Sequence, residues 1–267
     1  MEAIGLMYHD VVEHGVHRQS GFPTDDAATY KMSPALFDQH LGALSRSRPD
    51  GAITARELTR RITGSGGSHK RPLMITFDDG GKSSMYIAER LEQNGWRGHF
   101  FMTTGQIGDP AFLDADELRA LHARGHVIGS HSHTHPLRMG ALSASQLADE
   151  WGRSQDILEE ILGERQPIAS IPGGLYTREV ARAARRAGVE ILFTSEPTMR
   201  AWEVDGCLCL GRYFLKRTSP ATEAGRYASG DPLLCYRQLA MWEAKKVFKK
   251  VAGPLYLRVR NAILRKS

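Results

Sequence analysis

The segment Leu73–Gly80, with the sequence LMITFDDG, joins a short apolar run to two adjacent carboxylates and a glycine. A short apolar run that ends in a turn signal is typical of a strand buried on both faces, as strands of parallel sheets are. Six more runs of this kind occur along the chain: Ala3–Met7, His99–Met102, His126–Gly129, Ile168–Ile171, Val189–Phe193 and Cys207–Tyr213.

Most gaps between these runs carry signals that start helices. Ser33 precedes a proline in an N-cap arrangement, Thr54 and Glu57 form a capping-box pattern, and Ser143 and Thr177 open two further helical segments. Strands that alternate with helices predict a parallel sheet, because each strand needs a crossover long enough to return. We therefore expect an α/β fold, a distorted (β/α)7-type parallel barrel, with one catalytic domain over residues 1–235.

The charge of the chain is unevenly distributed. Its 267 residues are 41% apolar and 24% charged, as in a globular protein, and the formal net charge is +5. Eight basic residues and no acidic residue lie between Lys245 and Ser267, so the first 244 residues hold 27 basic and 30 acidic side chains, a net charge of −3. The basic surplus belongs to the tail, and we predict no nucleic-acid partner.

Residues 236–267 are expected to form a basic, amphipathic, helical C-terminal extension. One interpretation is a helix pair that packs on the barrel with solvated lysines. The other is a peripheral contact of residues 239–266 with anionic lipid, which would suit an enzyme that acts on lipid-linked saccharide.

The N-terminus and the cysteines indicate the compartment. Residues Met1–Asp10 lack a basic n-region and a long apolar stretch, so we do not expect them to form a secretory signal. The three cysteines, Cys207, Cys209 and Cys235, are too few for a disulfide framework and are expected to be small buried residues. We expect a cytoplasmic protein, either free or peripheral at the inner membrane face.

Polar clusters follow four of the predicted strands. Asp78 and Asp79 end one strand, the histidine-rich segment His131–His135 ends another, Tyr8–Asp10 follows the first, and Pro172–Gly174 follows the strand at residues 168–171. In a parallel barrel the carboxyl ends of all strands open on one face, where active sites are assembled. These four segments are therefore predicted to form one site.

The residue types in this site point to metal-dependent hydrolysis. His131 and His135, four residues apart, can approach one ion, and with a carboxylate they form an N/O ligand set that suits zinc, with cobalt, nickel, iron and manganese as alternatives. One of the two adjacent aspartates can bind the cation, while its neighbour stays ionised and takes a proton from water.

These motifs resemble those of the polysaccharide deacetylases, carbohydrate esterase family 4, which share the NodB homology domain. Thr76–Gly80 is similar to the first family motif, and His131–Pro136 to the second. The resemblance implies that Asp78 is the catalytic base, that Asp79, His131 and His135 bind the metal, and that N-acetylated sugars lose their acetyl groups. The chain is nearest to members associated with exopolysaccharides, some of which begin with a similar Tyr-His.

The chain departs from the family at its third and last motifs. Ser170 stands where the family has an arginine that steadies the catalytic aspartate, so another group is expected to orient Asp78. Gly173 stands at an aromatic position, although its backbone N–H, within the turn Pro172–Gly174, can still bind an oxyanion. The Leu-x-x-His that supplies the general acid is missing after Cys207–Tyr213.

These departures leave several hypotheses open. We expect His9 to replace the missing acid, although a histidine that merely holds a metal ligand is the alternative. The same constellation could cleave an acetyl ester of a carbohydrate. A different class is a catalytically silent protein on this scaffold that binds glycans or takes part in membrane assembly. The loop from His14 to Lys31 is expected to border the site.

Overall fold

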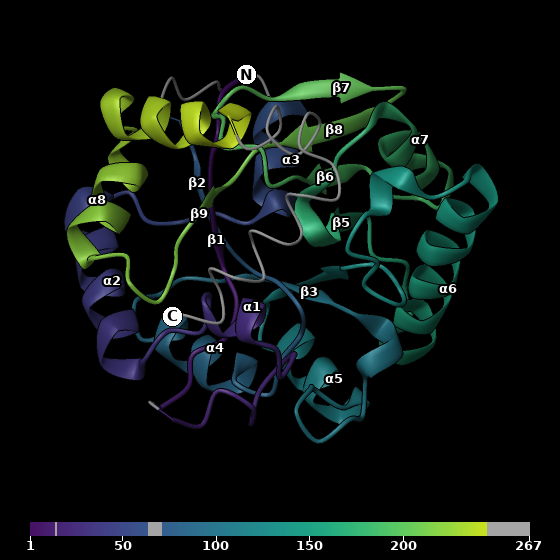
Figure 1. The fold of residues 1–267 in the computed structure, drawn as a ribbon, viewed down its shortest axis with the longest axis horizontal. Helices are drawn as coiled ribbons and strands as arrows, with labels where there is room; N and C mark the ends of the chain where they lie inside the picture. The colour runs from purple at the N-terminus through teal and green to yellow at the C-terminus, as the bar shows by residue number, and fades with distance from the viewer. Residues whose placement is uncertain (14, 64–70, 245–267) are drawn as a thin grey trace.

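A computed structural model describes residues 1–13, 15–63 and 71–244 (Figure 1). One sheet of nine strands, in the order β7-β8-β6-β5-β4-β3-β2-β1-β9, lies at its centre. The strands are β1 (Ile4–Tyr8), β2 (Leu73–Phe77), β3 (His99–Met102), β4 (Val127–Ser130), β5 (Ile168–Ser170), β6 (Ile191–Phe193), β7 (Trp202–Val204), β8 (Cys207–Leu210) and β9 (Tyr213–Phe214).

Helices surround this sheet. Figure 1 shows α2 and α8 together on one side of it, and α6 and α7 together on the other. The helices are α1 (Asp25–Ala28), α2 (Pro34–Ser47), α3 (Ala55–Thr63), α4 (Ser84–Glu92), α5 (Ala115–Ala123), α6 (Ala144–Leu162), α7 (Arg178–Arg186) and α8 (Ala221–Ser229), with 3-10 turns η1 (Thr104–Gln106), η2 (Met139–Ala141) and η3 (Pro172–Gly174). Residues 232–244 are also helical.

The predicted parallel barrel is confirmed, with one change at its end. Each strand from β1 to β6 pairs in parallel with its sequence neighbour, and β8 continues this series beside β6. The run Cys207–Tyr213, expected to be one strand, is two: β8 pairs with β6, whereas β9 pairs with β1 at the other end of the sheet. Gly211 and Arg212 therefore cross the seam at which the sheet curls into a distorted barrel.

Strand β7 was not expected and pairs antiparallel with β8 at the edge of the sheet. Its sequence, Trp-Glu-Val, is only partly buried, so it lacks the continuous apolar run that marks the central strands. The predicted helix starts are confirmed: Glu57 N–H donates to Thr54 Oγ1 at 3.2 Å, and Gln146 N–H donates to Ser143 Oγ at 3.3 Å.

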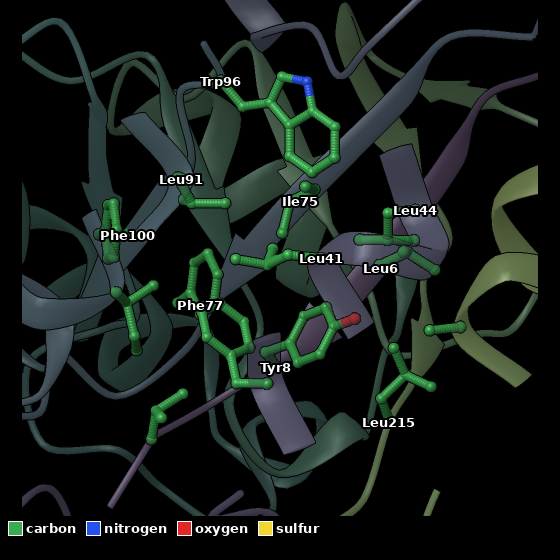
Figure 2. Close-up of a cluster of buried hydrophobic side chains, with 14 of the residues drawn as sticks. Leu6, Tyr8, Leu41, Leu44, Ile75, Phe77, Leu91, Trp96, Phe100 and Leu215 are labelled. Atoms are coloured by element: carbon green, nitrogen blue, oxygen red, sulfur yellow. The ribbon is translucent and has the colours of Figure 1, made fainter. Parts of the chain in front are cut away.

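The outer faces of the strands pack against the helices. Figure 2 shows Leu6 and Tyr8 of β1 and Ile75 and Phe77 of β2 in one cluster with Leu41 of α2. All five side chains are buried. Because strand residues alternate between faces, the residues between them point into the barrel.

The inner faces form a second cluster, which draws on strands all around the barrel. It includes Met74 of β2, Phe101 of β3 and Phe193 of β6. Thr76 is fully buried, and Asp78 follows Met74 and Thr76 in the same alternation. The catalytic-base candidate is thus aimed inward by the pleat of β2.

The prediction for the cysteines is confirmed, whereas the predicted C-terminal extension is described only in part. Cys207, Cys209 and Cys235 are free and buried, as expected. Of the extension at 236–267, only residues up to 244 are described, and there Gln238 accepts from Phe214 N–H at 3.1 Å. The basic segment from Lys245 lies outside the described residues, so the domain boundary at 235 stays a prediction. Within residues 1–13, 15–63 and 71–244, no helix combines the length and apolarity needed to cross a bilayer.

Candidate metal centre and active site

The ends of two strands bring three potential ligands together. Asp79 follows β2, and His131 and His135 follow β4; one ligand atom from each lies within 4.8 Å of the others. Asp79 Oδ1 is 3.6 Å from His131 Nε2 and 3.4 Å from His135 Nε2. The structure thus assembles the three residues expected to bind the metal.

The chemistry of this triad fits a divalent cation. Asp79 Oδ1 is buried and has no hydrogen-bond partner among the described residues, so an acceptor is left for a cation. Burial raises the pKa of Asp79, but His135, His9 and His131 together outweigh burial and hold this pKa far below its usual range. A carboxylate that stays ionised beside two imidazoles is the donor set of a zinc-type site, and it leaves the identity of the metal open.

The two histidines differ in their protonation. Burial lowers the pKa of His131 to about 4, so this imidazole is neutral at pH 7 and able to bind a metal. Its Nδ1 lies 2.5 Å from Ser170 Oγ, whose hydrogen is donated to Asp78, and 3.1 Å from the Ser170 carbonyl oxygen, which can only accept. Both partners therefore favour a proton on Nδ1, which leaves Nε2 to face Asp79. Burial lowers the pKa of His135 as well, but the Asp79 carboxylate outweighs burial and raises it.

Asp78 and Asp79 are adjacent in sequence, but their side chains point in different directions. Asp79 has a φ angle of 78°, in the left-handed region, which breaks the alternation of β2 immediately after Asp78. Asp78 continues into the barrel, whereas Asp79 turns toward His135. This local turn separates the two carboxylates, as the predicted division between base and ligand requires.

Arg212 supplies the charged contact that Ser170 lacks. Its Nη1 donates to Asp78 Oδ1 at 2.7 Å and its Nη2 donates to Asp78 Oδ2 at 2.9 Å. Ser170 Oγ gives the carboxylate a third hydrogen bond, by donating to Asp78 Oδ1 at 3.1 Å. Burial raises the pKa of Asp78, but Arg212 and His131 outweigh burial and hold this pKa below its usual range. Asp78 is therefore ionised at neutral pH.

Arg212 was not predicted as a site residue, although its position in the strand pattern indicated a buried charge. Cys207 and Cys209 pack outward with α7, so the alternate residues Leu208, Leu210 and Arg212 point into the barrel. The guanidinium is fully buried, also donates to Thr194 O at 3.1 Å, and lies in the seam of the barrel. A buried arginine needs an acceptor of opposite charge. The alternation of side chains along this strand therefore indicates a carboxylate inside the barrel as the partner of Arg212.

His9 lies at the site, as the strand-end argument predicted. It follows β1, and its charge lowers the pKa of both Asp78 and Asp79, which places it near the two carboxylates. Its ring stacks on Tyr30 at a centroid distance of 4.7 Å, and its Nδ1 is buried without a hydrogen-bond partner among the described residues. A ring nitrogen without a partner is thus left beside the two carboxylates.

The turn Pro172–Gly174 also reaches the site. Gly173 has a φ angle of 63°, and a Cβ built on it would lie 2.2 Å from the carbonyl oxygen of Leu137, two residues beyond His135. This close approach explains why glycine stands where the family has an aromatic residue. Trp242, from the helical residues 232–244, lies against Gly174 on the other side: a Cβ there would be 3.0 Å from its ring.

The loop before Lys31 borders the site, as expected for its described residues. Phe22 packs against the His135 ring at a centroid distance of 4.7 Å. The buried ammonium group of Lys31 holds this loop, because it donates to His17 O at 2.7 Å and to Phe22 O at 2.8 Å. These hydrogen bonds therefore hold the loop in place beside His135.

Comparisons with known proteins agree with this geometry. Residues 65–192 match the family model described as polysaccharide deacetylase. The peptidoglycan-N-acetylmuramic acid deacetylase PdaA of Bacillus subtilis is 25% identical over 133 residues, which cover 49% of this chain and 49% of that protein. The chain spans about half the length of the curated relatives it matches.

Two solved structures share the fold over most of the chain. The deacetylase PplD of Streptococcus pyogenes, in complex with acetate, has a TM-score of 0.68 at 21% identity and covers 83% of this chain and 95% of its own. IcaB from Ammonifex degensii has a TM-score of 0.68 at 20% identity, with 86% and 98% covered. The family match over residues 65–192, which contain Asp78, Asp79, His131 and His135, places this part of the chain in the polysaccharide deacetylase family, and the two structures show that the chain shares the fold of those proteins.

Proposed function

We propose that this protein is a metal-dependent hydrolase that removes N-acetyl groups from an N-acetylhexosamine-containing polysaccharide or its saccharide precursor. The observation that carries the proposal is an ionised base beside a cation-binding triad: Asp78 Oδ2 lies 4.0 Å from His131 Nε2, and Arg212 holds both carboxylate oxygens. Relatives named as deacetylases of peptidoglycan amino sugars support this substrate class.

A divalent ion held by Asp79, His131 and His135, zinc in our proposal, would supply Lewis-acid polarisation of the acetyl carbonyl and of the attacking water. Asp78 accepts a proton from that water at a carboxylate oxygen. Arg212 keeps the carboxylate ionised and fixes its plane, so the base is oriented before substrate arrives.

Two further groups complete the cycle. The backbone N–H of Gly173, within the turn Pro172–Gly174, stabilises the oxyanion that develops on the acetyl carbonyl. His9 donates a proton to the amine leaving group, which would otherwise depart as an unstable anion. The products are acetate and a free amino sugar.

Release of acetate from N-acetylglucosamine oligomers tests this proposal. The full chain is stripped of metal and supplied with Zn²⁺, and the Asp78→Asn variant serves as the matched control because it keeps the three ligand candidates. We expect acetate release that a chelator abolishes and that Asp78→Asn lacks. Acetate release that persists in the chelator or in the variant would overturn the mechanism, and no release from any acetylated saccharide would favour a silent glycan-binding scaffold.

Hydrolysis of an acetyl ester is the second candidate, because the late general-acid histidine of the family is missing after Cys207–Tyr213. An alcohol leaving group needs a proton less than an amine does. We therefore expect His9→Ala to lower amide cleavage much more than cleavage of an acetylated phenol by the same preparation. Equal losses on the two substrates would rule out His9 as the acid.

The location of the protein is a separate proposal, based on composition alone. Residues 239–266 would contact anionic lipid at the inner membrane face, with the rest of the chain in the cytoplasm. Flotation with anionic vesicles should be salt-sensitive and should be lost when the chain is truncated before Lys245. Flotation that survives the truncation would contradict this assignment.

A further inference from the structure

The turn that carries two of the three metal-ligand candidates lies outside regular secondary structure. Residues His131–His135 follow β4 directly, and two of them, Ser132 and His135, have φ angles of 65° and 58°. The left-handed region costs a non-glycine residue about 1–2 kcal/mol, so such a turn persists only where its surroundings hold it. The contacts around this turn therefore decide where the two imidazoles point.

Three of the five backbone N–H groups of this turn donate to the turn itself or to the neighbouring strands β3 and β4. His131 N–H donates to Met102 O of β3 at 2.7 Å. Ser132 N–H donates to Ser130 Oγ at 3.0 Å, and His135 N–H donates to Ser132 Oγ at 3.2 Å. These bonds fix the two ends of the turn.

The other two N–H groups, at the centre of the turn, share a single acceptor. Glu150 Oε2 accepts from His133 N–H at 3.0 Å and from Thr134 N–H at 2.9 Å. Glu150 Oε1 accepts from the Thr134 hydroxyl at 2.5 Å. One carboxylate thus gathers three hydrogens from the centre of the turn, and hydrogen bonds to a charged acceptor are stronger than neutral ones.

Glu150 reaches the turn from the buried side of helix α6. Its neighbours on that side are Leu147, Trp151 and Leu158, and Glu150 itself is only 9% exposed. Ser154, one helical turn further on, bonds Ser130 Oγ at 2.6 Å. A carboxylate on the buried side of a helix is unfavourable unless it is fully paired, and here its partners all belong to the turn that holds the metal-ligand candidates.

We propose that Glu150 is a positioning residue of the metal centre, which fixes the turn so that His131 and His135 both face Asp79. The inference rests on the proposed metal-dependent function. Without the carboxylate, two N–H groups lose their acceptor and the left-handed residues are free to relax, so the imidazoles no longer share one ion. Groups that orient metal ligands in this way typically contribute 10- to 100-fold to metal affinity.

The test measures metal binding and needs no substrate. Metal-stripped full-length wild type, Glu150→Gln and Glu150→Ala are titrated with Zn²⁺ against a chromophoric chelator. Glu160→Gln is the matched control, because Glu160 is exposed on the same helix. We expect the zinc dissociation constant to rise about 10- to 100-fold in the Glu150 variants and to stay unchanged in the control. Wild-type affinity in Glu150→Ala would overturn the proposal.

A second readout separates this inference from the proposed function. Hydrogen exchange of the His133 and Thr134 amides, measured on metal-free protein, should be faster in Glu150→Ala than in wild type, while the unfolding temperature reports whether the fold is kept. If Glu150→Ala does not fold, Glu150→Gln provides both measurements. Wild type that binds no zinc would defeat the proposed function, whereas unchanged exchange in a folded variant would defeat the role of Glu150.

Discussion

Replacement of Arg212 by methionine should destabilise the protein more than any change on its surface. The guanidinium is fully buried, grips both oxygens of Asp78, and also donates to Thr76 Oγ1 at 3.0 Å and to Thr194 O at 3.1 Å. Methionine fills much of the same volume, so the main loss is the charge that balances Asp78. Removal of one partner from a buried ion pair costs about 3–5 kcal/mol, a large share of a typical stability of about 5–15 kcal/mol.

Urea unfolding of four proteins measures this effect: wild type, Arg212→Met, Asp78→Asn and the double variant. The double variant contains no unpaired buried charge, so its loss should fall short of the sum of the single losses by about 2 kcal/mol. Arg182→Met is the control, because Arg182 pairs with Glu179 and Asp205 in solvent, where such pairs contribute little. Wild-type stability in Arg212→Met, or single losses that simply add, would refute the reasoning.

The ion pair of Asp78 with Arg212 also predicts how the free energy of unfolding changes with pH. In the folded wild type the pKa of Asp78 is lowered. The ion pair of Asp78 with Arg212 therefore contributes fully to the free energy of unfolding above the pKa of the unfolded state, about 4, and this contribution is lost as the pH falls through the lowered pKa of the folded state. In Arg212→Met, burial raises the pKa of Asp78, and folding takes up a proton instead. The stability deficit of the variant should therefore narrow as the pH falls from about 8 to about 5, and a constant deficit would contradict this account.

Four substitutions test the site. Asp78→Asn should lower kcat by about 10²- to 10⁴-fold with zinc affinity kept, whereas Asp79→Asn should weaken zinc binding itself; identical phenotypes in titration and kinetics would contradict the division of labour. His9→Ala should keep zinc affinity and lower amide turnover, and unchanged turnover would exclude it as the acid. Gly173→Ala should cost more than about 1 kcal/mol in thermal unfolding, because its φ angle is 63° and the added Cβ meets a carbonyl oxygen at 2.2 Å. Gly152→Ala is its control: it lies in helix α6 with open space around it, and alanine there should stabilise by up to about 1 kcal/mol.

Much of the site followed from local sequence patterns. Asp79, His131 and His135 belong to polar segments that directly follow apolar runs, and the carboxyl ends of parallel strands meet on one face of the barrel. His9 and Gly173 also follow predicted strands and were expected at that face for the same reason. These residues could be predicted because their position depends only on the order of strands and on the common direction of a parallel sheet.

The pairing of the last strands depends on more than their local sequence. Cys207–Tyr213 has the pattern of one strand, yet β8 pairs with β6 and β9 pairs with β1. Which strands meet at the seam depends on the curl of the whole sheet, a property of nine strands together. Trp202–Val204 was missed for a related reason, since an edge strand is stabilised by its neighbour more than by its own apolar residues.

The amino-acid sequence by itself determined the alternation of strands and helices and the strand ends at which the two aspartates and the histidines gather, because each depends on local patterns. The roles of Asp78 as base and Asp79 as metal ligand are implied by the family resemblance. Only the tertiary structure decided what holds them. Arg212 meets Asp78 across 134 positions of the chain, and Glu150 reaches His133 from a neighbouring helix. Such contacts depend on how the barrel closes and on which side of a helix faces it, so the sequence marks these residues only as charges that need a buried partner.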